Sequence, residues 1–333
     1  MEFSNYKEFV NYYKQFIGSG VVDSYFDAPL TKKQKDTGLT ATKLLNKVLD
    51  LFFYDKLVVA IKNNNYKLLL DCLNKVIAVG IDDLKAGVSS KWLKSKALPY
   101  SLGNKKVGKD TLIFNCTPAQ ICPSACQGLC NQCKTCYAFF SERRHIVETI
   151  RNLIAFRNLI LYDIEDIIMD TLQLLSKEKD LKKMIFIRIS SNGDLLDNKM
   201  LSDVNLLVGA VKSKFTNFMV AYTYTHNKLL DFSLNTEIVI NFSFKAPQGA
   251  KQTITAYRWD NKYLDNSKYV ICTGNCSGCS YCKDETETRI IVFMAHGGGL
   301  KGLKMLPDGL IDLLNHHKQL DYPIFEHKLK TTH

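Results

Sequence analysis

Thr111-Leu-Ile-Phe-Asn115 is a short apolar run that predicts a buried strand, and a cysteine-rich segment follows it directly. An amphipathic helix is predicted next, over residues 144–176. Further strands are predicted at 184–190, 217–224, 237–242 and 289–294, with helices at 203–211 and 308–318. Strands that alternate with helices indicate parallel pairing through right-handed crossovers. We therefore expect an α/β fold, a partial or full β/α barrel, with function at the carboxyl ends of its strands.

The chain is expected to have two parts. Residues 1–95 predict a helical N-terminal region, because apolar residues recur at helical spacing over 44–52 and 68–77. That region carries no chemical motif, which suits a cap or a partner-binding appendage. Residues 96–333 predict the barrel-like domain, in which all the cysteine clusters lie. Within it, Tyr222, Tyr224 and His226 alternate and should share one face, where core packing is the simpler role.

Composition narrows the class of protein. No apolar run reaches the roughly 18 residues of a membrane span, and residues 1–6 lack the layout of a secretory signal. A cytoplasmic protein is therefore expected. The net charge of +11 favours an anionic partner such as nucleic acid, although a lysine-rich solvated surface explains it equally. Basic residues between Lys91 and Lys109 surround Trp92 and Tyr100, a pattern typical of nucleic-acid binding.

The cysteines carry most of the information. Of the eleven, only Cys72 lies outside two tight groups, and it falls in a helical apolar pattern typical of a core thiol. The first group is Cys116, Cys122, Cys126, Cys130, Cys133 and Cys136, and the second is Cys272, Cys276, Cys279 and Cys282. Without an export signal, close-spaced cysteines hold metal more often than they form disulfides. The sequence therefore predicts metal binding.

Both groups contain the same spacing, C-x3-C-x2-C-x2-C, at residues 126–136 and 272–282. Thiolates are soft ligands that suit zinc or iron–sulfur clusters. Zinc is the alternative, because two C-x2-C pairs would make a structural zinc site. Ten clustered cysteines exceed the four that one zinc needs, and successive two-residue gaps are typical of iron–sulfur proteins. We expect one or two 4Fe–4S clusters, with Cys116 and Cys122 able to replace members of either set.

Several motifs occur in the order seen in a known family. They are the segment 103–114, Cys122-Pro123, Cys136-Tyr137-Ala138, Arg188-Ile-Ser190 and Gly193-Asp194. With them, residues 100 to 300 resemble the phage "gene product 88" family, whose layout is similar to radical S-adenosylmethionine (SAM) proteins. The resemblance implies a phage protein in the host cytoplasm.

The resemblance also implies roles for particular residues. In radical SAM enzymes a C-x3-C-x2-C motif ligates three irons of a 4Fe–4S cluster, and the fourth iron binds SAM. Cys126, Cys130 and Cys133 match this spacing, and so do Cys272, Cys276 and Cys279. Asp194, Gly193 and Asn192 stand where such enzymes hold the SAM amine, and Arg188 lies on the strand before them.

Two departures from the radical SAM pattern leave two functions open. Gln132 stands before Cys133, where an aromatic residue is usual, and Cys136 adds a fourth in-phase thiol that could close the iron needed by SAM. One function is a SAM-cleaving enzyme that modifies a macromolecule. The other is a non-enzymatic factor that binds nucleic acid, or a host or phage protein, and is stapled by structural metal centres. The sequence does not specify the substrate or the oligomeric state.

Overall fold

The structure is a computed structural model. It describes residues 4–14, 39–103, 107–130, 136–178, 185–243, 246–247, 250–256, 267–272, 274, 276 and 279–294. Over these residues, no helix combines the length and apolar character that a membrane crossing requires.

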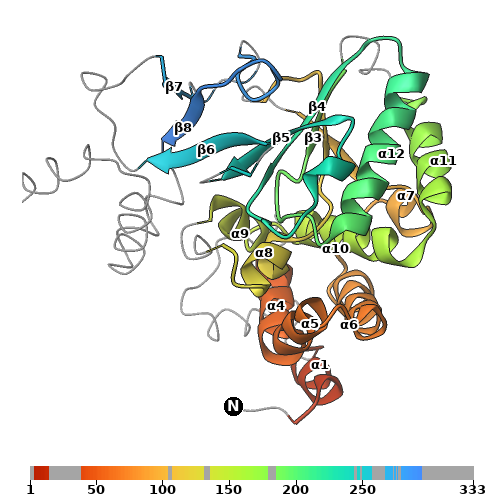
Figure 1. Ribbon diagram of the computed structural model, residues 1–333. Helices are drawn as coiled ribbons and strands as arrows, with labels where there is room; N and C mark the ends of the chain where they lie inside the picture. The colour runs from red at the N-terminus through yellow and green to blue at the C-terminus, as the bar shows by residue number, and fades with distance from the viewer. Residues whose placement is uncertain are drawn as a thin grey trace, which may run out of the picture.

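An eight-stranded sheet organises the protein (Figure 1). Its order is β1 (Tyr100–Leu102), β2 (Thr111–Phe114), β3 (Ile185–Ile189), β4 (Phe218–Thr225), β5 (Ile238–Ser243), β6 (Lys251–Ala256), β8 (Ile290–Met294) and β7 (Tyr269–Ile271). All neighbours pair in parallel except β1 and β2. The α/β class is thus confirmed. The described strands form an open sheet with edges β1 and β7, and they do not close a barrel.

Three of the longer helices of the described residues lie between the first parallel strands. These are α10 (Ile146–Leu161) and α11 (Ile164–Leu175) between β2 and β3, and α12 (Asn198–Lys214) between β3 and β4. α11 packs on α12, which packs on β4. The prediction of one helix over 144–176 was wrong, because the backbone leaves the helical conformation and is extended at Tyr162 and Asp163. The apolar periodicity continues across that break, so it conceals where one helix ends and the next begins.

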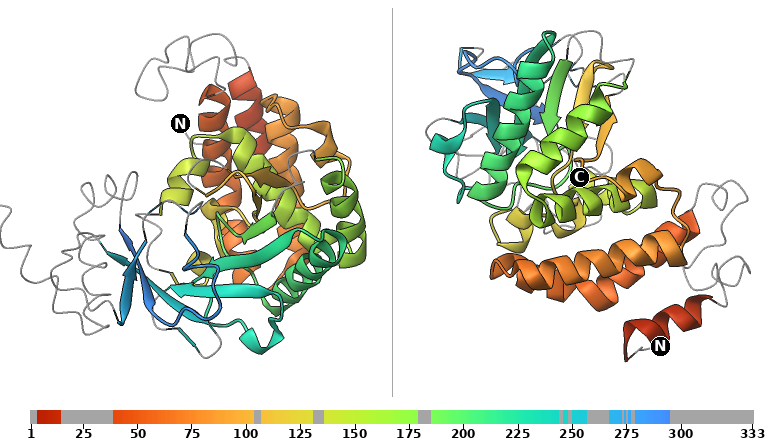
Figure 2. Two further views of the ribbon diagram at one scale, coloured as in Figure 1. Left: turned by 90° about the horizontal axis from the view of Figure 1, so that it is seen from above. Right: turned by 90° about the vertical axis from the view of Figure 1, so that its right-hand side faces the viewer.

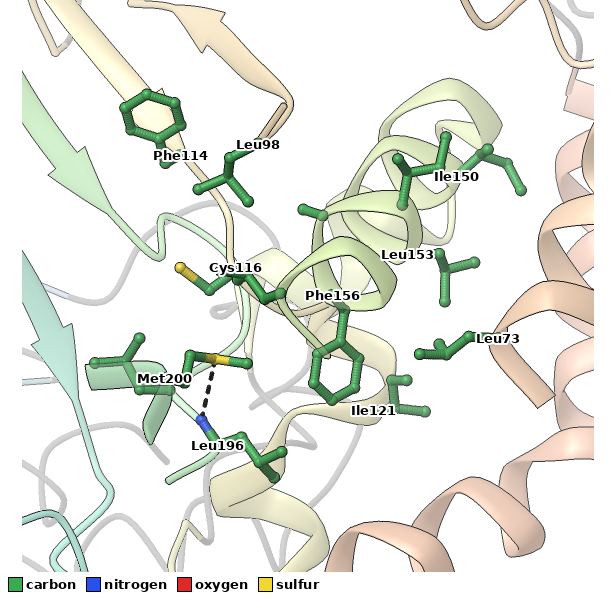
Figure 3. Close-up of a cluster of buried hydrophobic side chains, with 14 of the residues drawn as sticks. Leu73, Leu98, Phe114, Cys116, Ile121, Ile150, Leu153, Phe156, Leu196 and Met200 are labelled. Carbon is green, nitrogen blue, oxygen red and sulfur yellow. Dashed lines mark hydrogen bonds between the residues drawn. The ribbon is translucent and has the colours of Figure 1, made fainter. Parts of the chain in front are cut away.

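The described part of the N-terminal region, residues 4–14 and 39–95, is largely helical, and it shares the core of the sheet. It contains α1 (Tyr6–Lys14), α4 (Leu39–Val48), α5 (Tyr54–Lys62), α6 (Tyr66–Ala78) and α7 (Ser90–Leu93), with π-helical turns at Leu49–Phe53 and Val79–Asp83. α4 and α6 pack on α10, which lies between them and the sheet in Figure 2. One hydrophobic cluster runs from Leu73 through Ile150 and Phe156 to Phe114 (Figure 3). The N-terminal helices are therefore built into the core.

The Ile150 side chain of α10 comes very close to one turn of the N-terminal region. Gly80 lies in the π-helical turn, and a Cβ added there would stand 2.2 Å from Cδ1 of Ile150. Only glycine leaves room for this approach.

Five predicted strands are confirmed as β2, β3, β4, β5 and β8, and the helix predicted at 203–211 is part of α12. β1, β6 and β7 were missed. β1 and β7 have three residues each, and β6 is the polar segment Lys-Gln-Thr-Ile-Thr-Ala. Such segments lack the apolar run on which strand prediction depends. The helix predicted at 308–318 lies outside the described residues.

Candidate metal centre

The sheet has two chemically different faces. Ile185, Ile187 and Ile189 of β3 are buried in the hydrophobic core beneath the helices. Side chains alternate along a strand, so Phe186 and Arg188 point to the opposite face. The parallel register places Arg188 beside Tyr222 of β4, and Tyr224 of β4 beside Asn241 of β5. This second face is therefore aromatic and polar, and Tyr222 and Tyr224 share it, as their alternation predicted.

The chain between β7 and β8 folds over this face; it is the blue loop in Figure 1. We call residues 272–284 the C-terminal cysteine loop. Asn241 Nδ2 donates to the carbonyl of Cys282 at 2.9 Å. Lys251 Nζ donates to the carbonyls of Tyr281 and Asp284. Side chains of β5 and β6 thus fix the loop backbone. Function was expected at the carboxyl ends of the strands, whereas this cysteine group lies over the face of the sheet.

A small cavity, partly open to solvent, lies between the loop and the sheet. It is lined by Tyr222, Tyr224, Cys272, Cys276, Cys279, Cys282 and Lys283. All four cysteines of the second group therefore face one space. Among the residues described, no three His, Cys, Asp or Glu side chains are arranged as ligands of a single metal ion.

Three cations stand beside this cavity. Lys283 Nζ lies 4.1 Å from the ring centroid of Phe186 and donates to the carbonyl of Cys276 at 3.0 Å. Arg188 lies over the ring of Tyr224, at 5.3 Å. Lys251 lies near enough to Cys282 for the two groups to interact electrostatically. Burial lowers the pKa of both lysines, and negative charge on the cysteines opposes that shift. The neighbouring positive charges therefore favour a negatively charged group in the cavity.

The Cys282 thiol resists ionisation. Burial raises the pKa of Cys282 to about 12, the neighbouring cysteines add to the rise, and a hydrogen bond from Tyr224 opposes it. At neutral pH this thiol is protonated unless a cation is bound, so metal binding must displace protons. The site has four soft donors, neighbouring cations and a hydroxyl that donates a hydrogen bond to a sulfur. These features fit a thiolate-bound metal centre.

The first cysteine group follows β2, at the carboxyl edge of the sheet. Cys122 precedes α8 (Pro123–Cys126), and Cys136 precedes α9 (Tyr137–Glu142). Cys126 is buried, whereas Cys122, Cys130 and Cys136 are partly exposed. Cys133 lies outside the described residues. This group therefore lies at the carboxyl rim of the sheet, where function was expected.

Cys116 differs from the other members of this group. Its side chain is fully buried in the hydrophobic core (Figure 3) and interacts with the Ser190 hydroxyl. Burial raises its pKa to about 12. These surroundings favour a core thiol, and they offer no cation to balance a thiolate.

Asp194 lies at the centre of a buried clasp. Its Oδ2 accepts from Ser124 Oγ at 2.6 Å and from the His226 N–H at 2.8 Å. Its Oδ1 accepts from Thr225 Oγ1 at 2.6 Å and from the Leu195 N–H at 2.8 Å. A carboxylate has about four acceptor positions, and donors of this chain fill them. Asp194 therefore ties α8 to the ends of β3 and β4, and offers no remaining acceptor to an external amine.

The other residues predicted to contact SAM are also engaged. Gly193 adopts φ +68°, and a Cβ there would stand 2.3 Å from the Thr117 carbonyl oxygen, so glycine permits a close backbone approach. Asn192 Nδ2 donates to Glu148 at 2.7 Å. The structure brings Asp194, Gly193 and Asn192 together at the carboxyl edge. It places Arg188 apart from them, over Tyr224 and beside the cysteine cavity.

A buried carboxylate that sequence analysis missed supports the first cysteine group. Glu142 is fully buried and accepts from the N–H groups of Ala119 and Gln120 at 2.9 and 3.1 Å. It also accepts from Asn152 of α10 at 2.7 Å. It thereby attaches the turn before Cys122 to α10. A glutamate at a helix end resembles a solvated residue, so the sequence held no signal for this role.

We expect Glu142 to make stability depend on pH. Burial raises its pKa from 4.5 to about 7, so the folded state favours the neutral form. Stabilisation present below pH 4.5 is therefore lost as the pH rises through 7. At about 1.4 kcal/mol per pKa unit, the loss is about 3 kcal/mol. Denaturant unfolding should show wild type losing this much relative to Glu142→Gln between pH 5 and 8; a constant difference would show that Glu142 does not titrate there.

The basic stretch at 91–109 does not support stacking on bases. Trp92 and Tyr100 are buried, 7% and 5% exposed, and they pack edge to face. Lys91 pairs with Glu178, and Lys96 pairs with Asp166 at 2.7 Å. The expected aromatic platform is therefore part of the core, because alternation of charge and ring in the sequence does not show which rings are accessible.

Comparisons with known proteins do not extend this description: no family model, curated protein or solved structure matches the chain.

Proposed function

We propose that the protein is an iron–sulfur protein whose C-terminal cysteine loop holds a 4Fe–4S cluster. The observation that carries the proposal is the convergence of Cys272, Cys276, Cys279 and Cys282 on one cavity beside Lys283. Bound there, the cluster would supply one-electron chemistry or a structural cross-link. The chain supplies four sulfur ligands, cations that balance their charge, and strand side chains that hold the loop in place.

The number and spacing of the cysteines support a cluster over a zinc ion. A single zinc draws four ligands to about 2.3 Å from one point. This chain has ten clustered cysteines, and both groups contain the successive two-residue gaps that are typical of iron–sulfur proteins. A cluster spreads its iron atoms over a larger volume, so four thiols around a cavity can each reach a different iron. Zinc is the alternative metal, and chemical analysis for iron, zinc and sulfide distinguishes the two.

The four-cysteine set also constrains what such a centre does. Four protein ligands on four irons leave no iron open to SAM, so this centre suits electron transfer or structural support. We propose that a second centre forms at Cys126, Cys130, Cys133 and Cys136, which share the spacing of the first. The motifs that resemble the phage "gene product 88" family support two centres in one chain. Asp194 accepts hydrogen bonds from four internal donors, so it leaves no acceptor for the SAM amine.

The proposal is tested by counting iron, zinc and acid-labile sulfide per chain in protein purified without oxygen. We expect iron and sulfide in equal amounts, about four each for one cluster and about eight each for two. Zinc without sulfide would replace the proposal with a zinc-stapled protein. Addition of SAM and a strong reductant to the loaded protein should yield no 5′-deoxyadenosine if both centres are closed by four cysteines, and formation of that product would reopen the enzymatic function.

A further inference from the structure

Lys283 directly follows Cys282, and its side chain lies beside several of the sulfur ligands. Its ammonium group contacts the ring of Phe186 and donates to the Cys276 carbonyl. It also interacts electrostatically with Cys276, Cys279 and Cys282. The ring of Tyr222 lies 5.9 Å from the same nitrogen. Contact with two rings and a carbonyl holds the charge in one place, so its effect on the ligands does not average away as that of a mobile surface lysine would.

A second group acts on one sulfur directly. The Tyr224 hydroxyl hydrogen-bonds the Cys282 sulfur. Its ring is held between Tyr222 at 6.0 Å and Phe293 of β8 at 5.5 Å, both in edge contacts. Arg188 covers the ring. The hydroxyl is therefore aimed by packing from three strands, and it stands in a buried environment where a hydrogen bond to a charged sulfur is strong.

Resting on the proposed cluster at this loop, we propose that Lys283 and Tyr224 are positioning residues that raise its reduction potential and so make it an electron-transfer centre. Reduction adds one electron from a one-electron donor of lower potential, such as an iron–sulfur or flavin carrier, and no bond forms or breaks. The added electron makes the thiolate-bound centre more negative. A fixed ammonium and a hydroxyl donated to sulfur stabilise that extra charge, and charge and sulfur hydrogen bonds are what set such potentials.

The test is a dithionite titration followed by electron paramagnetic resonance on the full chain. The relevant signal is the one that disappears in the variant with both Cys279→Ser and Cys282→Ser. Lys283→Gln should lower the midpoint potential of that signal by at least about 59 mV, which is a tenfold change in the one-electron reduction equilibrium. Tyr224→Phe should lower it in the same direction by a smaller amount. Lys283→Arg, which keeps the charge, should stay near wild type.

Lys268→Gln is the matched control. Lys268 is exposed, lies over Tyr269 at 5.4 Å and does not line the cavity, so its loss should leave the potential unchanged. Equal shifts in Lys268→Gln and Lys283→Gln would overturn the inference, because they would reflect net charge alone. Unchanged potentials in Lys283→Gln and Tyr224→Phe, with full iron and sulfide, would overturn it while leaving the cluster proposal intact.

Failure of the proposed function looks different. Wild-type protein without iron and sulfide would remove the cluster itself, and the inference with it. Should Lys283→Gln lose its cluster, Tyr224→Phe decides, since that change removes one hydroxyl and keeps the ring packing. A wild-type potential in Tyr224→Phe would then count against the inference.

Discussion

Replacing Cys279 and Cys282 together by serine should remove one complete centre, with about four irons and four sulfides lost per chain. Both thiols face the same cavity as Cys272 and Cys276, so two of four ligands disappear from one site. With only two thiols left, the site should no longer bind a cluster, because burial in this cavity disfavours thiolates. Elemental and sulfide analysis of variant and wild type, prepared side by side without oxygen, measures the loss.

The control for this loss is Cys72→Ser. Cys72 is buried in α6 within the hydrophobic core, far in sequence from both groups. Its replacement should cost stability and leave iron and sulfide per folded chain unchanged. If the Cys279 and Cys282 variant kept its full iron and sulfide, the C-terminal cysteine loop would not be a cluster site.

The second large effect is expected at Asp194. Asp194→Ala should lower the free energy of unfolding by at least about 3 kcal/mol, because it leaves several buried donors without an acceptor at about 1–3 kcal/mol each. Ser124 and Thr225 are 0% and 1% exposed, so water cannot replace the carboxylate. Denaturant unfolding of cluster-loaded protein measures the change. Iron bound by the first cysteine group should fall too, since Ser124 lies in α8 between Cys122 and Cys126.

Asp231→Ala serves as the comparison for Asp194. Asp231 is exposed and accepts from the N–H and hydroxyl of Ser233, two residues on. The same substitution there should cost about 1 kcal/mol or less, as a lost cap does. Equal effects at the two aspartates would mean that the Asp194 clasp contributes no more than an exposed turn, and would return Asp194 to the residues available for a ligand.

Much of the fold could be predicted because its signals are local. Runs such as 111–115 and 184–190 are short, apolar and separated by helical patterns, and they became β2 and β3. The break at Tyr162 and the three-residue strand β7 could not be predicted, since neither interrupts nor creates a periodic apolar pattern. These features depend on tertiary packing, which overrides local preference.

The candidate site was predictable in its ligands and not in its surroundings. Spacing alone grouped Cys272 with Cys276, Cys279 and Cys282, because ligands within one loop are close in sequence. Tyr224, Arg188 and Lys251 come from strands far from that loop along the chain, and only the sheet register brings them beside it. Conversely, Asp194 stood where a ligand residue was expected, and its four internal donors are spread over residues 124 to 226.

The most direct test of the central claim is a crystal of anaerobically purified protein measured on both sides of the iron and zinc absorption edges. We predict an anomalous iron signal inside the cavity beneath the C-terminal cysteine loop, in contact with the sulfurs of Cys272, Cys276, Cys279 and Cys282. A zinc signal at that position, or a loaded crystal with no metal among these four sulfurs, would contradict the account.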